Sequence, residues 1–217
     1  MNGSGKSTLL KCLCNFLDYK GSIKINGNEI RGMKPKDLAQ KITILSQQTT
    51  MYFDYKVIDV IKFGLYSYEK FNINDEKIYE VLKNIGIHNL KDKYMSELSG
   101  GERQKVYIGR VFVQNPDIIL LDEFNNNLDI KSQIHIVENL NNWFKDKILI
   151  SVFHDLNLVR NLNSKVIALK DSKIYKYGDT DEVFCNENLR EIYEVDVENF
   201  MRNSLRKWEK GKYLFKN

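Results

Sequence analysis

The chain contains 217 residues, of which 42% are hydrophobic and 29% charged, a composition typical of a globular protein with a sizeable core. No run of 18 apolar residues occurs, so the sequence excludes a membrane-spanning helix as its central element. Six basic residues and one acidic residue in the last 17 positions account for the net charge of +4. The near-neutral remainder argues against nucleic acid as the main partner.

We expect the basic tail to be a solvated end of the chain, with a contact to a membrane surface or a partner as the alternative. Cys12, Cys14 and Cys185 have no metal-ligand spacing, and such sparse use of cysteine suits a reducing compartment. Because no signal peptide precedes the first motif, we expect a cytoplasmic protein.

The first half of the chain begins with a helix predicted over residues 6–17, directly after a glycine-rich stretch. Alternating residues 21–25 predict a short strand, and the Asn26-Gly27 turn that ends it usually joins antiparallel strands. The next predicted elements are a helical turn at 37–41, a strand at 42–45, and helices at 57–63, 75–85 and 102–113. Residues near 50–114 therefore look like a helical insertion.

In the second half, short apolar strands alternate with helices. The expected order is a strand at 118–122, a helix at 130–144, a strand at 148–152, a helix at 155–162, and strands at 166–169 and 173–177. This alternation predicts an α/β fold with a mainly parallel sheet that is covered on both faces.

The glycine-rich stretch at residues 3–8 has the pattern of a phosphate-binding loop. Gly3 and Gly5 let backbone N–H groups turn inward around an anion, and the helix that starts at Lys6 adds the positive end of its dipole. In this pattern Lys6 reaches the β- and γ-phosphates of a nucleotide, and the Ser7 hydroxyl holds Mg²⁺. The first glycine of the complete pattern would precede Met1. A glycine-rich turn without a ligand is the alternative.

The apolar run at 118–121 ends in two carboxylates, Asp122 and Glu123. Asp122 would approach Mg²⁺, and Glu123 would face the attacking water as a base or orienting group. An apolar strand that ends in Asp-Glu is common by itself. Downstream of a phosphate-binding loop, it is the expected second half of a nucleoside triphosphatase.

Residues 98–104, Leu-Ser-Gly-Gly-Glu-Arg-Gln before a predicted helix, resemble the signature motif of the ABC (ATP-binding cassette) ATPases. A serine hydroxyl and backbone N–H groups at a helix N-terminus suit a phosphate, and a glycine-rich cap without a ligand is the alternative. Three further features follow the family order: Gln47 resembles the Q-loop glutamine, residues 126–129 the D-loop, and His154 the switch histidine. Each alone could be a surface glutamine, a helix N-cap or a loop histidine.

The resemblance implies a P-loop NTPase (RecA-like) fold, an inserted helical subdomain, and ATP and Mg²⁺ as ligands. It divides one ABC ATPase domain, 1–217, into a nucleotide-binding core (1–49 and 115–195), a helical subdomain (50–114) and a basic C-terminal tail (196–217).

The resemblance also implies a role for each matching residue. Ser7, Gln47 and Asp122 would hold Mg²⁺. Glu123 would polarise the attacking water, Gln47 would lie near that water, and His154 would touch the γ-phosphate. Contacts with ATP are implied for Asn2, Gly3, Ser4, Gly5, Lys6, Ser7, Thr8, Ser99, Gly100, Gly101 and Asp129.

Of these residues, Ser99 and Gly101 would contact ATP bound to the opposite subunit, so the resemblance implies a head-to-tail homodimer. The residues themselves support this expectation. Lys6 already holds the phosphates of its own chain, so a second phosphate cap suggests a site completed in trans and dimerisation that depends on ATP.

Residues 42–47, 98–104 and 154–158 are similar to importer ATPases for iron–siderophore, haem or cobalamin uptake, and 166–173 and 178–183 continue the similarity. It implies membrane permease subunits as partners, indirect contact with a substrate-binding protein, and a peripheral position at the inner face of the cell membrane.

In such systems the segment after Gln47 receives a coupling helix of the permease. Here that segment is residues 49–65, which include Met51, Tyr52, Phe53 and Tyr55. Aromatic residues in a loop suit an exposed docking surface. The alternative is that they pack the helical insertion.

The sequence departs from the family pattern at several places. Phe124 stands where proline is usual, and Gly109 where alanine is common, the latter at a cost of up to about 1 kcal/mol. The strand that feeds the phosphate loop and the aromatic that stacks on adenine have no counterpart, and without that central strand its neighbours would expose unpaired backbone groups.

Two alternatives to an importer ATPase follow. A mis-assigned gene start or a truncated, non-catalytic chain would explain the incomplete loop; for the former, we expect the in-frame upstream sequence to encode a glycine, an apolar strand and an aromatic. A soluble ABC ATPase that acts on nucleic acid or ribosomes is the other alternative, but such proteins usually carry two cassettes or long insertions.

Overall fold

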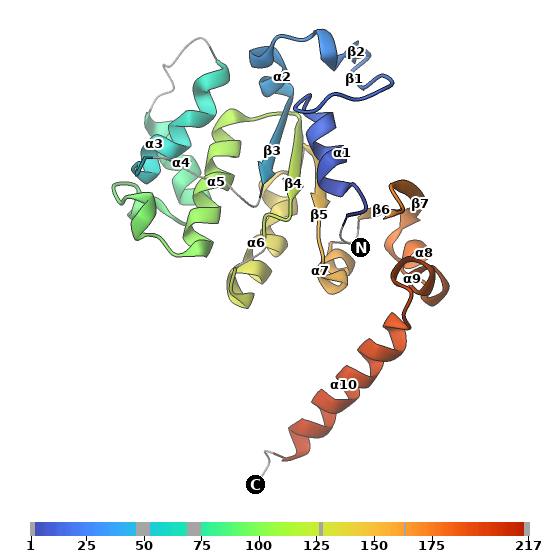
Figure 1. Cartoon of the computed structure of the whole chain (residues 1–217). Coiled ribbons are helices and arrows are strands. Elements are labelled where there is room, and N and C mark those ends of the chain that lie inside the picture. The colour runs from blue at the N-terminus through green and yellow to red at the C-terminus, as the bar shows by residue number, and fades with distance from the viewer. Residues whose placement is uncertain (1–2, 47–52, 69–74, 126–127, 163, 215–217) are drawn as a thin grey trace. The chain divides into compact units, whose positions relative to one another are not determined.

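The computed structural model describes residues 3–46, 53–68, 75–125, 128–162 and 164–214 (Figure 1). The chain divides into two compact units, one formed by Ser7–Leu158 and the other by Met1–Lys6 with Val159–Asn217. Each unit is described by itself.

A three-stranded parallel sheet lies at the centre of the unit Ser7–Leu158. Its strands are β3 (Ile42–Ser46), β4 (Ile118–Asp122) and β5 (Ile148–Val152), in the order β3-β4-β5 (Figure 1). The register aligns Ser46 with Asp122 and Asp122 with Val152. All three predicted strands are confirmed, and their carboxyl ends meet at one edge of the sheet.

Helices cover both faces of this sheet, because alternate residues of β4 enter different clusters. Ile119 and Leu121 pack in a core with residues of α3, α5 and α6, while Leu120 packs with Leu10 of α1 and Leu38 of α2. The side chains of Ile119, Leu120 and Leu121 are at most 1% exposed. Burial on both faces explains why the sequence of β4 is a continuous apolar run and not an alternating one. The expected α/β architecture with a mainly parallel sheet is confirmed.

The helices that lie in this unit or cross its ends (α1 begins at Lys6, and α7 ends at Asn161) follow the predicted order with small shifts at their ends. The α-helices are α1 (Lys6–Leu13), α2 (Pro35–Lys41), α3 (Val57–Lys62), α4 (Asp75–Asn84), α5 (Gly100–Gln114), α6 (Ile130–Trp143) and α7 (Leu156–Asn161). The 3₁₀ turns are η1 (Ile30–Gly32), η2 (Phe63–Ser67), η3 (His88–Leu90) and η4 (Met95–Glu97).

Helix α1 ends four residues earlier than predicted. Asn15 adopts a left-handed conformation with φ +57°, and the N–H of Phe16 donates to the carbonyl of Lys11 at 2.9 Å. These are features of a helix that ends on a left-handed residue. Asn tolerates that conformation better than most residues, so Asn15 stops the helix although Phe16 and Leu17 continue the apolar pattern.

The predicted antiparallel turn at Asn26-Gly27 is confirmed, but the strands that it joins are shorter than expected. Strand β1 (Lys24–Ile25) pairs with β2 (Asn28–Glu29), and both turn residues have positive φ. Gly21, expected at the start of the strand, instead has φ +103°.

In the part of the chain that the structure describes, β5 has a strand neighbour on one side alone. Its first residue, Ile148, is 59% exposed, whereas Ile119 on the central strand is 1% exposed. The outer edge of β5 therefore offers backbone groups that another strand could pair with.

Gly109 has a packing role that the sequence did not reveal. A Cβ atom at this position would lie 2.7 Å from Cδ1 of Ile85 and 3.1 Å from Cδ1 of Ile61. The missing side chain thus lets α5 approach Ile61 of α3 and Ile85, the residue after α4, which offsets the lower helix propensity of glycine.

The second unit contains the two strands predicted there, β6 (Lys165–Lys170) and β7 (Lys173–Asp179), and they pair antiparallel. Asp171 and Ser172 form its turn with positive φ. Three helices follow: α8 (Thr180–Val183), α9 (Asn186–Tyr193) and the long α10 (Val197–Leu214), and α10 contacts α9 (Figure 1). None of the three was predicted as a helix. Among the described residues, no helix is both long and apolar enough to cross a membrane.

Candidate active site

Two residues 115 positions apart meet at the carboxyl end of β4. The Ser7 hydroxyl, in the first turn of α1, donates a hydrogen bond of 2.9 Å to Oδ1 of Asp122. Asp122 is only 7% exposed, because it ends the central strand of the sheet. A buried carboxylate needs such a partner, so this bond fixes the start of α1 relative to β4.

These two oxygens fit a magnesium ion. Mg²⁺ prefers oxygen ligands in octahedral geometry at 2.0–2.1 Å, and ligands at adjacent positions of such an ion lie about 2.9 Å apart. It is usually bound by one or two protein groups together with water and substrate phosphates. The described residues contain no cluster of three or more His, Cys, Asp or Glu side chains that could hold a metal ion.

Glu123 and His154 form a second pair at the same edge of the sheet. Nε2 of His154 lies 2.7 Å from Oε1 of Glu123. Glu123 directly follows β4, and His154 comes two residues after β5. Glu123 has φ +50°, a conformation that is uncommon for a residue with a side chain and that often marks a functional position.

An aromatic pair lies next to Glu123 and His154 in the sequence. Phe124 is 2% exposed, and its ring meets that of Phe153 edge-to-face with centroids 5.8 Å apart. Phe124 therefore has a core-packing role where the family usually has proline. The contact joins the segment after β4 to the segment after β5, and so supports the geometry of the Glu123–His154 pair.

The phosphate-loop residues Gly3 to Lys6 belong to the other unit. Gly3 and Gly5 have φ +75° and +89°, which glycine adopts without strain. Ser4 is buried and accepts a hydrogen bond of 3.2 Å from Nζ of Lys6. Thr8, on α1 after Ser7, is exposed, and Asn2 lies outside the described residues.

The signature segment begins helix α5 as predicted, and Ser99 is its N-cap. The Ser99 hydroxyl accepts from the backbone N–H of Glu102, and the Ser99 N–H donates to the Glu102 carboxylate at 2.9 Å. That N–H, followed by the Ser99 hydroxyl, holds the pKa of Glu102 below its usual range. Ser99 and Gly100 are exposed, and an anion at the start of α5 would compete with Glu102 for the Ser99 N–H and hydroxyl.

Gly101 brings the start of α5 against the start of α6. A Cβ atom on Gly101 would lie 2.3 Å from Oγ of Ser132, which glycine alone avoids. Ser132 in turn donates its N–H and its hydroxyl to Asp129, the N-cap of α6, at 2.9 and 2.7 Å. These bonds, that of the N–H first, lower the pKa of Asp129.

Sequence reasoning missed Ser132, although its position three residues after Asp129 matches a capping pattern. It also missed Gln133, whose side-chain amide donates to the carbonyls of Asn125 and Leu128 at 3.3 and 3.1 Å. These two residues hold the segment on either side of residues 126–127, which lie outside the described residues. Gln47 also lies outside them, directly after Ser46 at the end of β3.

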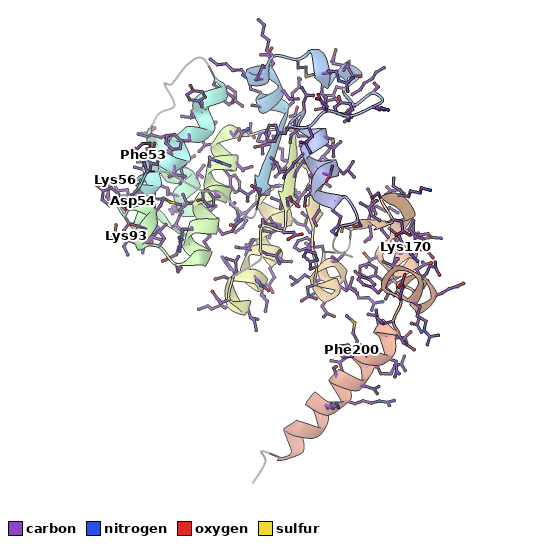
Figure 2. The ribbon with its side chains drawn as sticks, viewed as in Figure 1. Phe53, Asp54, Lys56, Lys93, Lys170 and Phe200 are labelled. Carbon is purple, nitrogen blue, oxygen red and sulfur yellow. The ribbon has the colours of Figure 1, made fainter. Side chains whose placement is uncertain are left out.

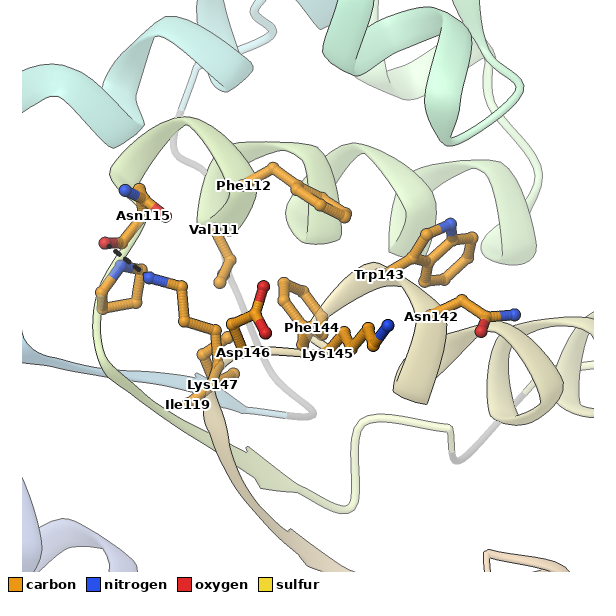
Figure 3. A pocket seen from close by; sticks show the side chains of 11 residues that line it. Val111, Phe112, Asn115, Ile119, Asn142, Trp143, Phe144, Lys145, Asp146 and Lys147 are labelled. Carbon is orange, nitrogen blue, oxygen red and sulfur yellow. Dashed lines mark hydrogen bonds between the residues drawn. The ribbon is translucent and has the colours of Figure 1, made fainter.

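A hollow of about 240 Å³ lies near the amino ends of β4 and β5. It is lined by Phe112 of α5, by Trp143 and Phe144 at the end of α6, and by Lys147 just before β5 (Figure 3). Asp122 instead ends β4, and His154 follows β5. Because the strands are parallel, this hollow is not part of the candidate active site.

Comparisons with known proteins agree on one family. A family model described as ABC transporter matches residues 1–126. An uncharacterized ABC transporter ATP-binding protein of Methanocaldococcus jannaschii is 39% identical over 203 residues, which cover 91% of this chain and 79% of that protein. A petrobactin import ATP-binding protein of Bacillus subtilis is 33% identical over 90% of this chain and 80% of its own length.

A hemin import ATP-binding protein of Bartonella henselae is 32% identical over 90% of this chain and 78% of its own length. Among solved structures, an inward-facing conformation of a putative metal-chelate type ABC transporter matches 90% of this chain and 76% of that chain. Its TM-score is 0.76 at 24% identity, which supports the fold.

Proposed function

Because this chain belongs to the ABC transporter family and is one of its ATPases, we propose that it is the ATP-hydrolysing subunit of an importer for an iron–siderophore, haem or cobalamin-type substrate. Relatives named for petrobactin and hemin import match about nine-tenths of the chain at 32–33% identity. They support this substrate class without selecting one compound.

The observation that carries the proposed mechanism is the pair of contacts at one sheet edge. Ser7 bonds Asp122 at 2.9 Å, and Glu123 lies 2.7 Å from His154. The first pair supplies oxygen ligands for Mg²⁺, and the second supplies a carboxylate beside a titratable imidazole. Placing metal ligands next to a possible base is what hydrolysis of a nucleoside triphosphate requires.

Each residue then has a role in ATP hydrolysis. Lys6 and the amides of residues 2–8 bind the phosphates, and Ser7 and Asp122 hold Mg²⁺ with Gln47 near the metal and the water. When bound, Mg²⁺ neutralises charge that develops on the phosphate oxygens. Glu123 accepts a hydrogen bond from the attacking water, and His154 leaves Glu123 to touch the γ-phosphate.

The signature segment acts on the nucleotide of a second copy of the chain. Ser99, Gly100 and Gly101 start α5, and Asp129 starts α6 beside them through the close contact of Gly101 with Ser132. The exposed N-cap of α5 offers a hydroxyl and backbone N–H groups to an anion. We therefore propose a head-to-tail homodimer in which each ATP lies between two copies.

The permease subunits dock on residues 53–67 and the hollow beside them. Phe53 (Figure 2) and Tyr66 are 72% and 71% exposed. Tyr55 is half-buried and meets Phe63 edge-to-face, with ring centroids 5.0 Å apart. An adjoining hollow of about 800 Å³ is lined by Phe63, Tyr66 and the half-buried Arg110, among others. Met51 and Tyr52, expected in the same surface, lie outside the described residues.

Backbone and side-chain bonds connect this docking segment to the segment before Ser99. Asp54 accepts from the N–H and the hydroxyl of Ser96 at 3.1 and 2.6 Å. The N–H of Met95 donates to the carbonyl of Tyr55 at 2.9 Å, and Lys56 pairs with Tyr94. A permease that moves residues 53–56 would thus move the start of α5.

We further propose the domain division expected from the sequence, with a nucleotide-binding core at 1–49 and 115–195, a helical subdomain at 50–114, and a basic tail at 196–217. Between residues 53 and 114, the described elements are helical. With the permease as its attachment, the protein would lie at the inner face of the cell membrane and meet a substrate-binding protein only indirectly.

Reconstitution with the cognate permease tests the proposed function. Vesicles that hold the permease and this protein should take up iron-loaded siderophore or haem in an ATP-dependent manner, and the permease should raise the ATPase rate. A Glu123→Gln variant is the control and should give no uptake. ATPase activity that responds to ribosomes or DNA, and not to the permease, would contradict the importer assignment.

A further inference from the structure

Helix α10 has an anchored beginning. Asp196 caps it by accepting from the N–H of Asn199 at 3.0 Å, and it also pairs with Arg190 of α9. The first residue of the helix, Val197, is 9% exposed. The helix is therefore tied to its own unit at the N-terminal end.

Beyond this anchor, large apolar side chains lie in solvent. Phe200 is 73% exposed and Leu205 is 65% exposed, and Figure 2 shows Phe200 directed away from the helix near its start. Exposure of this extent at two large apolar positions of one helix calls for a partner surface.

The sequence arranges α10 as an amphipathic helix. With 3.6 residues per turn, Phe200, Met201, Leu205 and, by continued spacing, Trp208 fall on one face. Arg202, Arg206 and Lys210 fall on the opposite face, Glu198, Glu209 and Lys207 fall at the borders, and Lys212 falls between Met201 and Leu205.

Helix α10 carries a net positive charge. Between Val197 and Leu214 there are five basic and two acidic residues, and Arg202 pairs with Glu198. Arg206 and Lys207 are exposed. The polar side of α10 thus carries an excess of cations, and the opposite face carries aromatic and aliphatic residues. Helices that lie in the plane of a membrane interface have this pattern.

We propose that α10 docks on the surface of an anionic membrane, with Phe200, Met201 and Leu205 in the headgroup region and the basic residues against lipid phosphates. Lysines beside or within the apolar face, Lys207 and Lys212 by sequence spacing, can extend their ammonium groups to the headgroups while their stems cover apolar surface. The protein then binds the membrane directly, in addition to its contact with the permease.

A second copy of the helix is a poorer occupant of this face. Two α10 helices packed together would bring five basic residues and only two acidic ones from each copy into proximity. Anionic lipid supplies the complementary charge.

Vesicle sedimentation without any permease tests the proposal. The full chain should sediment with phosphatidylglycerol vesicles at about 0.1 M salt, bind phosphatidylcholine vesicles at least tenfold more weakly, and dissociate at about 1 M salt, where charges are screened within about 3 Å. Removing two cations in Arg206→Gln/Lys207→Gln should weaken binding by roughly 20- to 30-fold, since each cation near such a surface changes binding about fivefold.

A second double variant and a fluorescence measurement test how far the apolar face contributes to vesicle binding. Phe200→Ser/Leu205→Ser should weaken vesicle binding by about tenfold or more. The chain has two tryptophans, so in a Trp143→Phe background the fluorescence of Trp208 alone should shift to shorter wavelength when vesicles are added. The matched control, Lys173→Gln/Lys176→Gln, removes the same charge from exposed positions of β7 and should bind like the unmodified chain.

Equal binding to neutral and anionic vesicles, or equal weakening by the β7 and α10 charge variants, would overturn the proposal. So would a concentration-dependent dimer that is lost in the Phe200/Leu205 variant and occurs without vesicle binding, since a second copy would then cover this face. Because the vesicles contain no permease, none of these results bears on the proposed importer function.

Discussion

Nε2 of His154 lies 2.7 Å from Oε1 of Glu123, which joins the residue after β4 to the loop after β5. The two groups are therefore within hydrogen-bond distance of each other. While Glu123 accepts a hydrogen bond from the His154 imidazole, only one of its carboxylate oxygens remains for the attacking water. The proposed mechanism therefore requires the bond between Glu123 and His154 to break when a γ-phosphate draws His154 away.

The pair predicts the effect of His154→Ala. This change removes both the partner of Glu123 and the proposed contact with the γ-phosphate, so we expect the turnover number to fall by about 10²-fold or more. ATP affinity should change far less, because Lys6 and the loop amides carry most of the phosphate binding. Steady-state kinetics and equilibrium ATP binding would measure the two effects, and an unchanged turnover number would exclude this role for His154.

Ser7 is predicted to be a metal ligand and not only a partner of Asp122. Ser7→Ala removes the hydroxyl, so activity at low Mg²⁺ should be lost and a higher Mg²⁺ concentration should be needed for half-maximal rate. Ser7→Thr keeps the hydroxyl and should restore most of the activity. The ATPase rate of the unmodified chain, Ser7→Ala and Ser7→Thr would be measured against Mg²⁺ concentration. An unchanged magnesium requirement in Ser7→Ala would show that Ser7 is not a metal ligand.

The bonds between Asp54 and Ser96 predict a route from the permease to the signature segment. Asp54→Ala should reduce the stimulation of ATPase activity by the permease severalfold, because residues 53–56 would no longer pull on residues 94–96. Ser96→Ala removes the hydroxyl bond and keeps the bond from the Ser96 N–H, so it should have a smaller effect. The double variant should be no worse than Asp54→Ala alone, and strictly additive losses would show that the two residues act independently.

Gly109 is predicted to be required for core packing. Gly109→Ala should destabilise the protein by about 1–3 kcal/mol, since the added methyl group would lie 2.7 Å from Ile85 and the core must shift to admit it. Gly32→Ala is the matched control, because nothing lies within 4 Å of a Cβ atom there. Denaturant unfolding compares the two, and an equal free energy of unfolding would contradict the packing role.

The features that the sequence predicted well are local or repeated in pattern. The bounds of β5 are as predicted, and β3 and β4 differ by at most one residue, because apolar runs between polar turns mark buried parallel strands. Asp122, Glu123 and Ser99 take their positions from the strand end or helix start that their own sequence defines.

The features that it missed depend on neighbours distant in sequence. Nothing near Gly101 in the chain indicates that Ser132 would crowd its Cβ position, and nothing near Phe124 indicates that Phe153 would meet its ring. The early end of α1 at Leu13 reflects the left-handed backbone of Asn15, which overrides an apolar pattern that continues to Leu17.

The central claim is that Glu123 acts on the attacking water, and a single-turnover comparison of the unmodified chain with Glu123→Gln tests it most directly. Glutamine keeps the size of the side chain but cannot act as a base, so ATP should still bind with similar affinity while cleavage slows by at least about 10²-fold. ATP-dependent dimers of the variant should then persist. Cleavage at an unchanged rate in Glu123→Gln, with ATP bound as in the unmodified chain, would contradict the mechanism.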